Sequence, residues 1–308
     1  MKILFVTSNR LGDAVLSTGL LDHLIRTYPD ARITVVCGPV AEGVFARMPN
    51  RERTIVLRKR RGSRHWLPLW AATLPHLWDL VVDIRGSALS WLIPTRRRAI
   101  FRRTAGPKIA ELAAMLKLST PPSPVVWTSS ADRQRVGEIL GDGPVIALAP
   151  TANWLPKVWP AERFAAFFHR MAGPGTRAVV LGGPGETERA MAAPLMAALP
   201  DSIDLVGRLS LPEVAACLER ASLFIGNDSG LMHLSAAAGA PTVGLFGPTD
   251  AATYGPVGRR AVAVVADTMP AISVDRAVAA ARALLDQPPT AETSSASAAG
   301  TSRRVVSS

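Results

Sequence analysis

Cysteine is scarce in this chain: there are two, Cys37 and Cys217, in 308 residues. Both lie in apolar runs, which indicates buried free thiols in a reducing compartment and argues against a disulfide. No secretory leader is evident, because Lys2 is followed by only four apolar residues before the first hydroxyl side chain. We therefore expect a protein of the cytoplasm.

Long uninterrupted apolar runs are also lacking. The 229–249 segment contains no Asp, Glu, Lys or Arg, but glycine and proline interrupt it at Gly230, Gly239 and Pro241. We interpret it as two short buried elements, since a membrane-spanning helix needs about 20 apolar residues. A soluble or peripheral membrane protein is expected.

Several motifs of nucleotide and metal enzymes are absent. There is no Gly-x-x-x-x-Gly-Lys-Ser/Thr loop, no His-Glu-x-x-His, no Gly-x-Gly-x-x-Gly, and no Asp-x-Asp pair of the sort that holds a divalent ion against a nucleotide sugar. We therefore expect no metal and no cofactor, and any phosphate leaving group would have to be neutralised by protein groups.

Positive charge is plentiful, with 35 Lys and Arg against 24 Asp and Glu and a net charge of +11. Such a balance favours an anionic partner. Arg and Lys concentrate in residues 51–64 and 96–103, and four tryptophans lie between the two stretches. Trp66 and Trp70 are spaced to share a helix face. No nucleic-acid motif is present, so nucleic acid is not expected.

Arginine beside tryptophan is typical of a surface that meets lipid headgroups or an amphipathic anion. The alternative is a solvated basic face beside a core helix. The candidate residues for an acceptor or membrane surface are Arg58, Lys59, Arg60, Arg61, Arg96, Arg97 and Arg98.

Apolar strands alternate with helical patterns in both halves of the chain, which predicts α/β architecture with parallel sheets. The predicted strands are 3–6, 33–37, 55–57, 80–84, 145–149, 178–181, 203–205, 223–225 and 242–246. The predicted helices are 14–28, 132–140, 161–171, 186–199, 211–220, 231–238 and 273–285.

The pattern restarts after a Ser- and Pro-rich segment, which indicates two domains. We predict an N-terminal Rossmann-like domain over 1–141, with a linker at about 119–141. A second such domain follows over 142–286. The tail, 287–308, is rich in Ser, Ala and Thr and is expected to be disordered.

The most informative stretch is Ser222–Asp250, where a strand, a turn and a helix follow one another. Asp228 and Ser229 are good N-cap residues, and Gly230 permits close approach of a ligand. A helix that begins just after a strand offers free backbone N–H groups to a phosphate. His233 lies one turn into the helix on the same face. The alternative is a capped helix with a structural histidine.

Three other loops follow predicted strands, at the edge where α/β folds bind ligands. Asp13 suits a helix cap or a carboxylate base, and the two roles are compatible. Thr151 and Lys157 lie in the long 150–160 loop, where Lys157 would be a mobile charge suited to a phosphate. Glu186, after Gly182-Gly-Pro-Gly185, suits a ribose hydroxyl or the first turn of a helix.

Together these motifs resemble glycosyltransferase family 9, the ADP-heptose:lipopolysaccharide heptosyltransferases. The resemblance rests on Asp228-Ser-Gly-Leu-Met-His233 and Gly239-Ala-Pro-Thr-Val-Gly-Leu-Phe-Gly-Pro-Thr-Asp250. Arg10-Leu-Gly-Asp13, Trp78-Asp-Leu-Val-Val-Asp83 and Lys157-Val-Trp-Pro160 agree with it in order and spacing. The chain differs from the family in being short, in reaching its final helix quickly after Asp250, and in lacking a cysteine-containing segment found there in some members.

The resemblance implies a GT-B fold, in which two Rossmann-like domains face each other across a cleft. The first domain would bind the acceptor and the second the nucleotide sugar. The implied reaction is metal-independent, inverting transfer of a heptose from ADP-heptose to a lipopolysaccharide-type acceptor at the cytoplasmic face of the inner membrane. The alternatives are a GT-B transferase for another nucleotide sugar and a catalytically silent nucleotide-sugar-binding protein.

The same resemblance implies roles for single residues. Asp13 would be the general base, and Lys157 would contact the phosphate or the transferred sugar. The diphosphate would be held by Ser229, Gly230 and His233. The donor-binding set is completed by Thr151, by Glu186 at the ribose, and by Asp228, which would cap the helix or bond a sugar hydroxyl.

Overall fold

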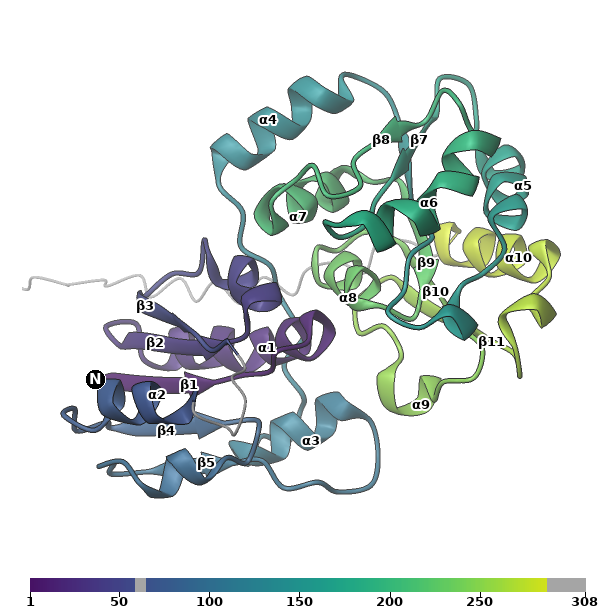
Figure 1. Ribbon diagram of the computed structural model, residues 1–308. Helices are drawn as coiled ribbons and strands as arrows, with labels where there is room; N and C mark the ends of the chain where they lie inside the picture. Colours follow the sequence, from purple (N-terminus) through teal and green to yellow (C-terminus); the bar gives the residue numbers. More distant parts are fainter. Residues whose placement is uncertain (59–64, 287–308) are drawn as a thin grey trace, which may run out of the picture.

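The computed structural model describes residues 1–58 and 65–286, in two α/β units that each contain one parallel sheet (Figure 1). The sequence predictions for Lys59, Arg60, Arg61 and the 287–308 tail fall outside the described residues. No helix among the described residues is both long and apolar enough to cross a membrane.

The first sheet has the strand order β3-β2-β1-β4-β5, and every neighbouring pair is parallel. Its strands are β1 (Lys2–Val6), β2 (Arg32–Cys37), β3 (Arg51–Val56), β4 (Leu80–Asp83) and β5 (Arg98–Ile100). The connecting helices and 3₁₀ turns are α1 (Leu11–Thr27), η1 (Pro39–Phe45), α2 (Trp66–Thr73), η3 (Ala88–Trp91) and α3 (Lys108–Met115).

The second sheet has the order β11-β10-β9-β6-β7-β8 and is also parallel throughout. Its strands are β6 (Val145–Ala149), β7 (Arg177–Val180), β8 (Ile203–Asp204), β9 (Leu223–Asn227), β10 (Thr242–Phe246) and β11 (Ala261–Val265). The remaining elements are α4 (Ser130–Leu140), η4 (Leu155–Lys157), α5 (Ala161–Met171), α6 (Glu186–Ala198), α7 (Leu211–Arg220), α8 (Gly230–Ala237), α9 (Ala251–Tyr254), η5 (Met269–Ala271) and α10 (Val274–Leu285).

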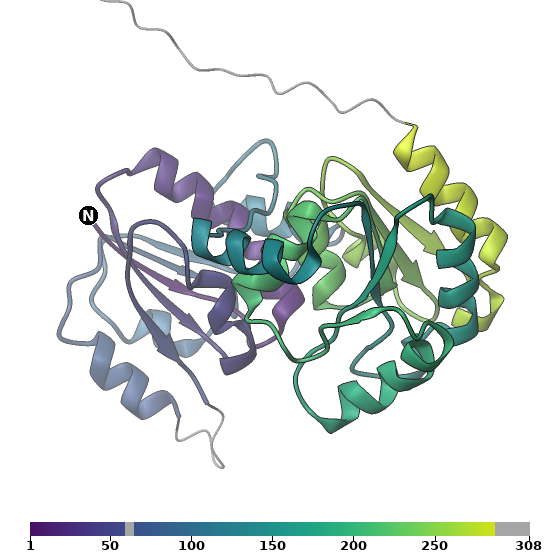
Figure 2. The same ribbon diagram turned by 90° about the horizontal axis from the view of Figure 1, so that it is seen from above.

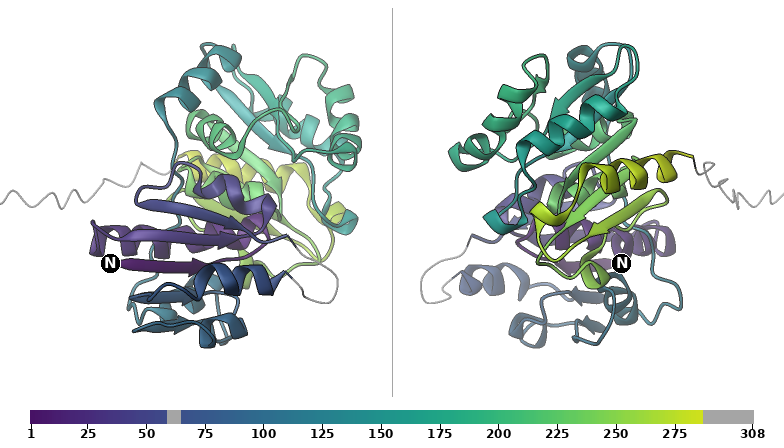
Figure 3. Two further views of the ribbon diagram at one scale, coloured as in Figure 1. Left: turned by 60° about the vertical axis from the view of Figure 1, so that its left-hand side comes forward. Right: turned by 90° about the vertical axis from the view of Figure 1, so that its right-hand side faces the viewer.

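Both faces of each sheet are covered, as buried parallel strands require. In the first unit α1 and α2 lie on opposite faces of the sheet (Figure 2). In the second unit α10 packs beside the edge strand β11 and its neighbour β10 (Figure 3, right).

The core under α1 continues into the second unit. One cluster of buried side chains includes Val15 and Leu20 of α1 together with Cys217 of α7 and Met232 of α8. Burying apolar area from both units in one cluster stabilises their arrangement, at about 25 cal/mol for each Å² removed from water.

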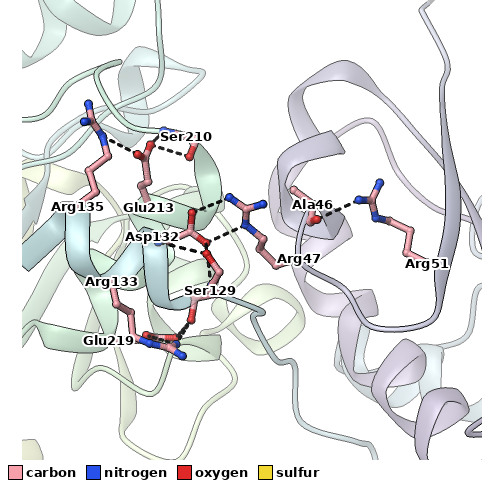
Figure 4. Close-up of polar contacts among 11 residues, drawn as sticks. Ala46, Arg47, Arg51, Ser129, Asp132, Arg133, Arg135, Ser210, Glu213 and Glu219 are labelled. Carbon is pink, nitrogen blue, oxygen red and sulfur yellow. Dashed lines mark hydrogen bonds and ion pairs between the residues drawn. The ribbon is translucent and has the colours of Figure 1, made fainter.

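Three contacts bring the two units together. The first turns of α1 and α8 abut so closely that a Cβ added at Gly12 would lie 2.8 Å from Cδ2 of His233. A Cβ at Gly43 in η1 would lie 2.9 Å from Cβ of Leu211 in α7. Beyond η1, Arg47 donates two hydrogen bonds of 2.9 Å to the Asp132 carboxylate at the start of α4 (Figure 4).

The predicted boundary at residues 141 and 142 falls between α4 and β6. The helix of the predicted linker does not stand apart, because α4 packs against α7 of the second unit (Figure 1).

Some predicted elements need correction. The first helix begins at Leu11, so the prediction that it starts at Ala14 is wrong. The chain does not pass quickly from Asp250 to its last helix, because α9, β11 and η5 intervene. The short strand β5 was also missed.

Candidate functional site

The N-terminus of α8 carries no side-chain cap. Its N-cap residue is Ser229, whose side chain makes no capping hydrogen bond, so the first backbone N–H groups of the helix have no partner from the cap. The Ser229 Oγ is buried and has no hydrogen-bond partner in the part of the chain that the structure describes. This end of α8 therefore has the free donors that a phosphate binds.

Asp228 does not cap α8, contrary to one of its two predicted roles. Its carboxylate lies 2.6 Å from Nζ of Lys157, and the side chains are 10% and 18% exposed. Lys157 is thus held by an ion pair and is not the freely mobile charge that the sequence suggested. An ammonium group has three N–H donors, so two of them remain for a second anion.

Asn227, the last residue of β9, fixes the loop that carries Lys157. Its Oδ1 accepts from the backbone N–H of Trp159 at 3.0 Å, and its Nδ2 donates to the Pro150 carbonyl at 2.8 Å. The Trp159 indole is fully buried and donates to the Ile272 carbonyl at 2.9 Å. Sequence reasoning missed Asn227, although a carboxamide that directly follows a buried strand is a signal for such a role.

The other two predicted donor contacts come from the neighbouring loops. Thr151 is buried just after β6, and a Cβ built on Gly182 would lie 3.3 Å from its Cγ2. Glu186 is exposed as the first residue of α6. Glu188, also in the first turn of α6, instead accepts a hydrogen bond from Gly183 N at 3.1 Å and shapes the glycine loop.

Asp13 lies in the first turn of α1, three positions after the N-cap residue Arg10. It is not the N-cap, so that predicted role is wrong, although a negative charge here is favoured by the helix dipole. Its Oδ2 accepts from Ser8 Oγ at 3.1 Å, and the side chain is half-buried. The carboxylate therefore has a fixed position at the carboxyl edge of the first sheet.

His233 lies where the predicted residues of both units meet. The pKa of His233 is lowered to about 4, mainly by burial. The negative charges of Asp228 and Asp13 oppose this shift, and the positive charge of Lys157 adds to it. The imidazole is thus neutral at pH 7. Its Nδ1 is buried without a hydrogen-bond partner among the described residues.

The structure brings Asp13, Lys157 and Asp228 close to this histidine. Gly12, next to Asp13, packs so closely on His233 that an added Cβ would lie 2.8 Å from its Cδ2. Asp228, paired with Lys157, lies two residues before the start of α8. Asp13 comes from the first unit, and the other two come from the second. A carboxylate that can accept a proton therefore faces a cation and a free helix N-terminus, which is the arrangement that acid–base chemistry on a phosphorylated substrate needs.

The arginines of the predicted basic surface do not join this group. Arg58 is exposed just after β3. Arg96 pairs with Asp79 at 3.5 Å, and Asp79 in turn accepts from the backbone N–H of Lys2, so both lie at the amino edge of the first sheet. Arg97 donates to the Tyr28 hydroxyl at 3.5 Å. Arg98 donates to the carbonyl of Ser90 at 2.7 Å.

Sequence reasoning also missed a polar rim beside Asp13. Arg85 donates to Asn9 Oδ1 at 3.2 Å, and its guanidinium lies 5.2 Å from the ring centre of Trp66. The fully buried Asp83 holds the loop that carries Arg85, accepting from Arg85 N and Ser87 N at 2.8 Å each.

The chain is similar to one protein family along most of its length. The family model described as Glycosyltransferase family 9 (heptosyltransferase) matches residues 86–282. Lipooligosaccharide heptosyltransferase 2 of Haemophilus influenzae is 24% identical over 81% of this chain and 84% of its own length. Lipopolysaccharide heptosyltransferase 1 of Pseudomonas aeruginosa is 27% identical over 87% of this chain and 84% of its own length.

Solved structures show the same fold. The glycosyl transferase family 9 structure from Veillonella parvula superposes with a TM-score of 0.78 at 21% identity, covering 92% of this chain and 97% of that one. The E. coli ADP-heptose lps heptosyltransferase II gives a TM-score of 0.75 at 19% identity, with 92% and 98% covered. The predicted GT-B architecture is confirmed.

Proposed function

Because the chain belongs to glycosyltransferase family 9 and is therefore a glycosyltransferase, we propose that it moves a heptose from ADP-heptose to a lipopolysaccharide core acceptor. Named relatives that are lipopolysaccharide and lipooligosaccharide heptosyltransferases support this choice of sugar and acceptor. The single observation that carries the proposal is the close packing of the first turn of α1, which holds Asp13, on His233 of α8, beside the Lys157–Asp228 ion pair.

In the proposed step, Asp13 takes the proton from the acceptor hydroxyl. The acceptor oxygen then forms a bond to the anomeric carbon on one face of the sugar, while the bond from that carbon to the ADP oxygen breaks on the other. The configuration inverts, and ADP leaves with the electron pair of the broken bond. Since negative charge develops on the leaving phosphate, groups placed there in advance lower the barrier.

The donor would be held by the second unit. Lys157 and the free N–H groups at Ser229 and Gly230 would neutralise the diphosphate, and the neutral imidazole of His233 would add one hydrogen bond. Asp228 would position Lys157 and accept from a sugar hydroxyl with its second oxygen. We assign Thr151 to the diphosphate side and Glu186 to the ribose.

The proposal includes metal independence, since Lys157 and the α8 N-terminus supply the positive charge. Turnover in the presence of EDTA should match turnover without it. A loss of activity that added Mg²⁺ restores would contradict this part of the proposal.

The experiment that tests the function is calorimetric titration of the full chain with ADP-, UDP- and GDP-sugars. We expect the ADP-sugar to bind most tightly, and Lys157→Met to weaken that binding about tenfold or more, as the loss of a charge-assisted contact would. Arg282→Met, on the exposed side of α10, is the matched control. A clear preference for a UDP-sugar would overturn the heptose assignment and leave glycosyl transfer intact.

Membrane contact at the cytoplasmic face of the inner membrane is also part of this proposal. It follows from the lipid nature of the acceptor and from the basic charge of the chain.

A further inference from the structure

An exposed apolar surface covers the outside of α2 and η3 in the first unit. The inner side chains of this layer, such as Leu69 and Leu89, pack on the first sheet. The outer ones face solvent, and we call them the α2–η3 surface: Leu67 (66% exposed), Trp70 (38%), Leu74 (36%), Trp91 (64%) and Leu92 (62%). Large apolar side chains gathered on one face of a soluble protein mark an interaction site.

The two elements form one continuous surface because they are tied together. Nε1 of Trp70 in α2 donates to the carbonyl of Leu92, just after η3, at 3.0 Å. The indole nitrogen of Trp70 is thereby already satisfied, although the side chain is 38% exposed. This hydrogen bond fixes the side chain of Trp70 against the residue that follows η3.

Arginines border this surface on both sides. Arg53 of β3 donates to the Ala72 carbonyl of α2 at 3.2 Å. Arg98 of β5 donates to the Ser90 carbonyl, and its guanidinium lies 5.7 Å from the ring centre of Trp91. The Arg53 guanidinium is therefore held against the backbone of α2, and the Arg98 guanidinium is held beside the exposed Trp91.

Acidic side chains are missing from the described segments that build this part of the first unit. Residues 53–58, 65–78 and 84–110 contain nine Arg and Lys and no Asp or Glu. Tryptophan, leucine and arginine without acidic neighbours match the interface of an anionic bilayer, where the rings lie at headgroup depth and the guanidinium groups meet phosphates. A surface that binds another protein more often carries charges of both signs.

One end of the α2–η3 surface reaches the proposed base. Trp66, the first residue of α2, lies under the Arg85 guanidinium, which bonds Asn9. The adjacent Ser8 donates to Asp13. An acceptor anchored in a membrane under α2 would thus have its sugar near the first turn of α1, which carries the proposed base.

We propose that the α2–η3 surface binds the anionic membrane interface and inserts Trp91, Leu92 and Leu67 among the headgroups. Binding itself is independent of the transferase assignment; the delivery of a lipid-anchored acceptor to Asp13 rests on the proposed function.

The test is cosedimentation of the full chain with vesicles of phosphatidylcholine and phosphatidylglycerol, against vesicles of phosphatidylcholine alone. The wild type should bind the anionic vesicles, and added salt should weaken binding. Replacing Leu67, Trp91 and Leu92 together by Ser should reduce the partition coefficient at least about tenfold. The matched control carries Val265→Ser and Leu285→Ser, two exposed apolar residues of the second unit, and should bind as the wild type does.

Charge is tested separately. Arg53→Gln should lower anionic-vesicle binding about fivefold, and Arg282→Gln should not. Because no sugar donor is present, these results do not depend on the transferase assay. Equal losses in the surface and control variants, or no binding of the wild type to acceptor-free vesicles, would overturn the proposal. The second outcome would mean that the surface takes the acyl chains of a single acceptor instead of a bilayer.

Discussion

Asp13 is the residue on which the proposed chemistry depends most. In Asp13→Asn the amide keeps the shape of the carboxylate and can still accept from Ser8, but it cannot take a proton. We expect kcat to fall by about 10²- to 10⁴-fold, the usual contribution of a general base, with donor affinity unchanged. Single-turnover kinetics and calorimetry measure the two quantities. Full turnover by the variant would rule Asp13 out as the base.

Gly12, next to the base, holds the two units at close range. A Cβ there would lie 2.8 Å from Cδ2 of the buried His233, so Gly12→Ala must shift the His233 ring or move α1 away from α8. We expect kcat to fall by up to about 10²-fold, since a shift of about 1 Å in a catalytic group has such an effect. Gly137→Ala, in α4, is the control because its new Cβ meets only the flexible end of Arg220, at 3.4 Å. Equal kinetics for the two variants would mean that the α1–α8 contact does not position the base.

At the scale of the element, α8 combines a helix N-terminus with a buried neutral histidine. The pKa of His233 is about 4 in the folded protein, below its ordinary value of 6.5. The unfolded chain therefore binds the extra proton first as the pH falls. The stability that the neutral form provides is complete above pH 6.5 and declines between pH 6.5 and pH 4, by at most about 1.4 kcal/mol for each pH unit.

Denaturant unfolding at several pH values tests this effect. The wild type should lose stability between pH 6.5 and pH 4, and His233→Gln should lose less over the same range. His23→Gln serves as the control, because His23 is only half-buried and lies on α1, away from α8. A wild-type curve that is flat in this window would show that His233 is not held neutral by burial.

The elements that sequence reasoning predicted well are those with strong local signals. Strand 145–149 and helices 161–171 and 211–220 have the predicted bounds, because buried parallel strands are apolar throughout and amphipathic helices have a clear period. The start of α1 was missed because its N-cap, Arg10, makes no capping bond and so gives no signal. The strand β5 is three residues long and begins with Arg98, so pairing with β4 decides its conformation.

At the scale of the whole molecule, the sequence placed the candidate residues at the ends of strands, where parallel sheets bring them to one edge. The sequence could not show which of these residues contact one another. The ion pair of Lys157 with Asp228 spans 71 residues of sequence and depends on the loop that Asn227 holds. The meeting of Asp13 with this pair depends on how the two units pack, which no local pattern encodes.

That packing is secured at a distance from the site by Arg47 and Asp132 (Figure 4). Asp132 also accepts hydrogen bonds from N and Oγ of Ser129 at 2.8 and 2.6 Å. These bonds hold its carboxylate in place independently of Arg47. The hydrogen bonds to this carboxylate, led by that of Arg47, hold the Asp132 pKa well below its ordinary value, so the pair stays charged in mildly acidic solution. A planar guanidinium with two parallel bonds also restricts orientation.

We therefore expect Arg47→Met to loosen the two units without unfolding either of them. Fluorescence energy transfer between dyes placed one on each unit should show a broader distance distribution, and high salt should broaden the wild-type distribution in the same direction, because part of the charge pair is exposed to solvent. Arg51→Met is the matched control, since Arg51 donates to the Ala46 carbonyl within its own unit (Figure 4). If Arg47→Met leaves the distribution as narrow as that of the control, the shared apolar core alone fixes the units, and the ion pair has no part in bringing Asp13 to the donor site.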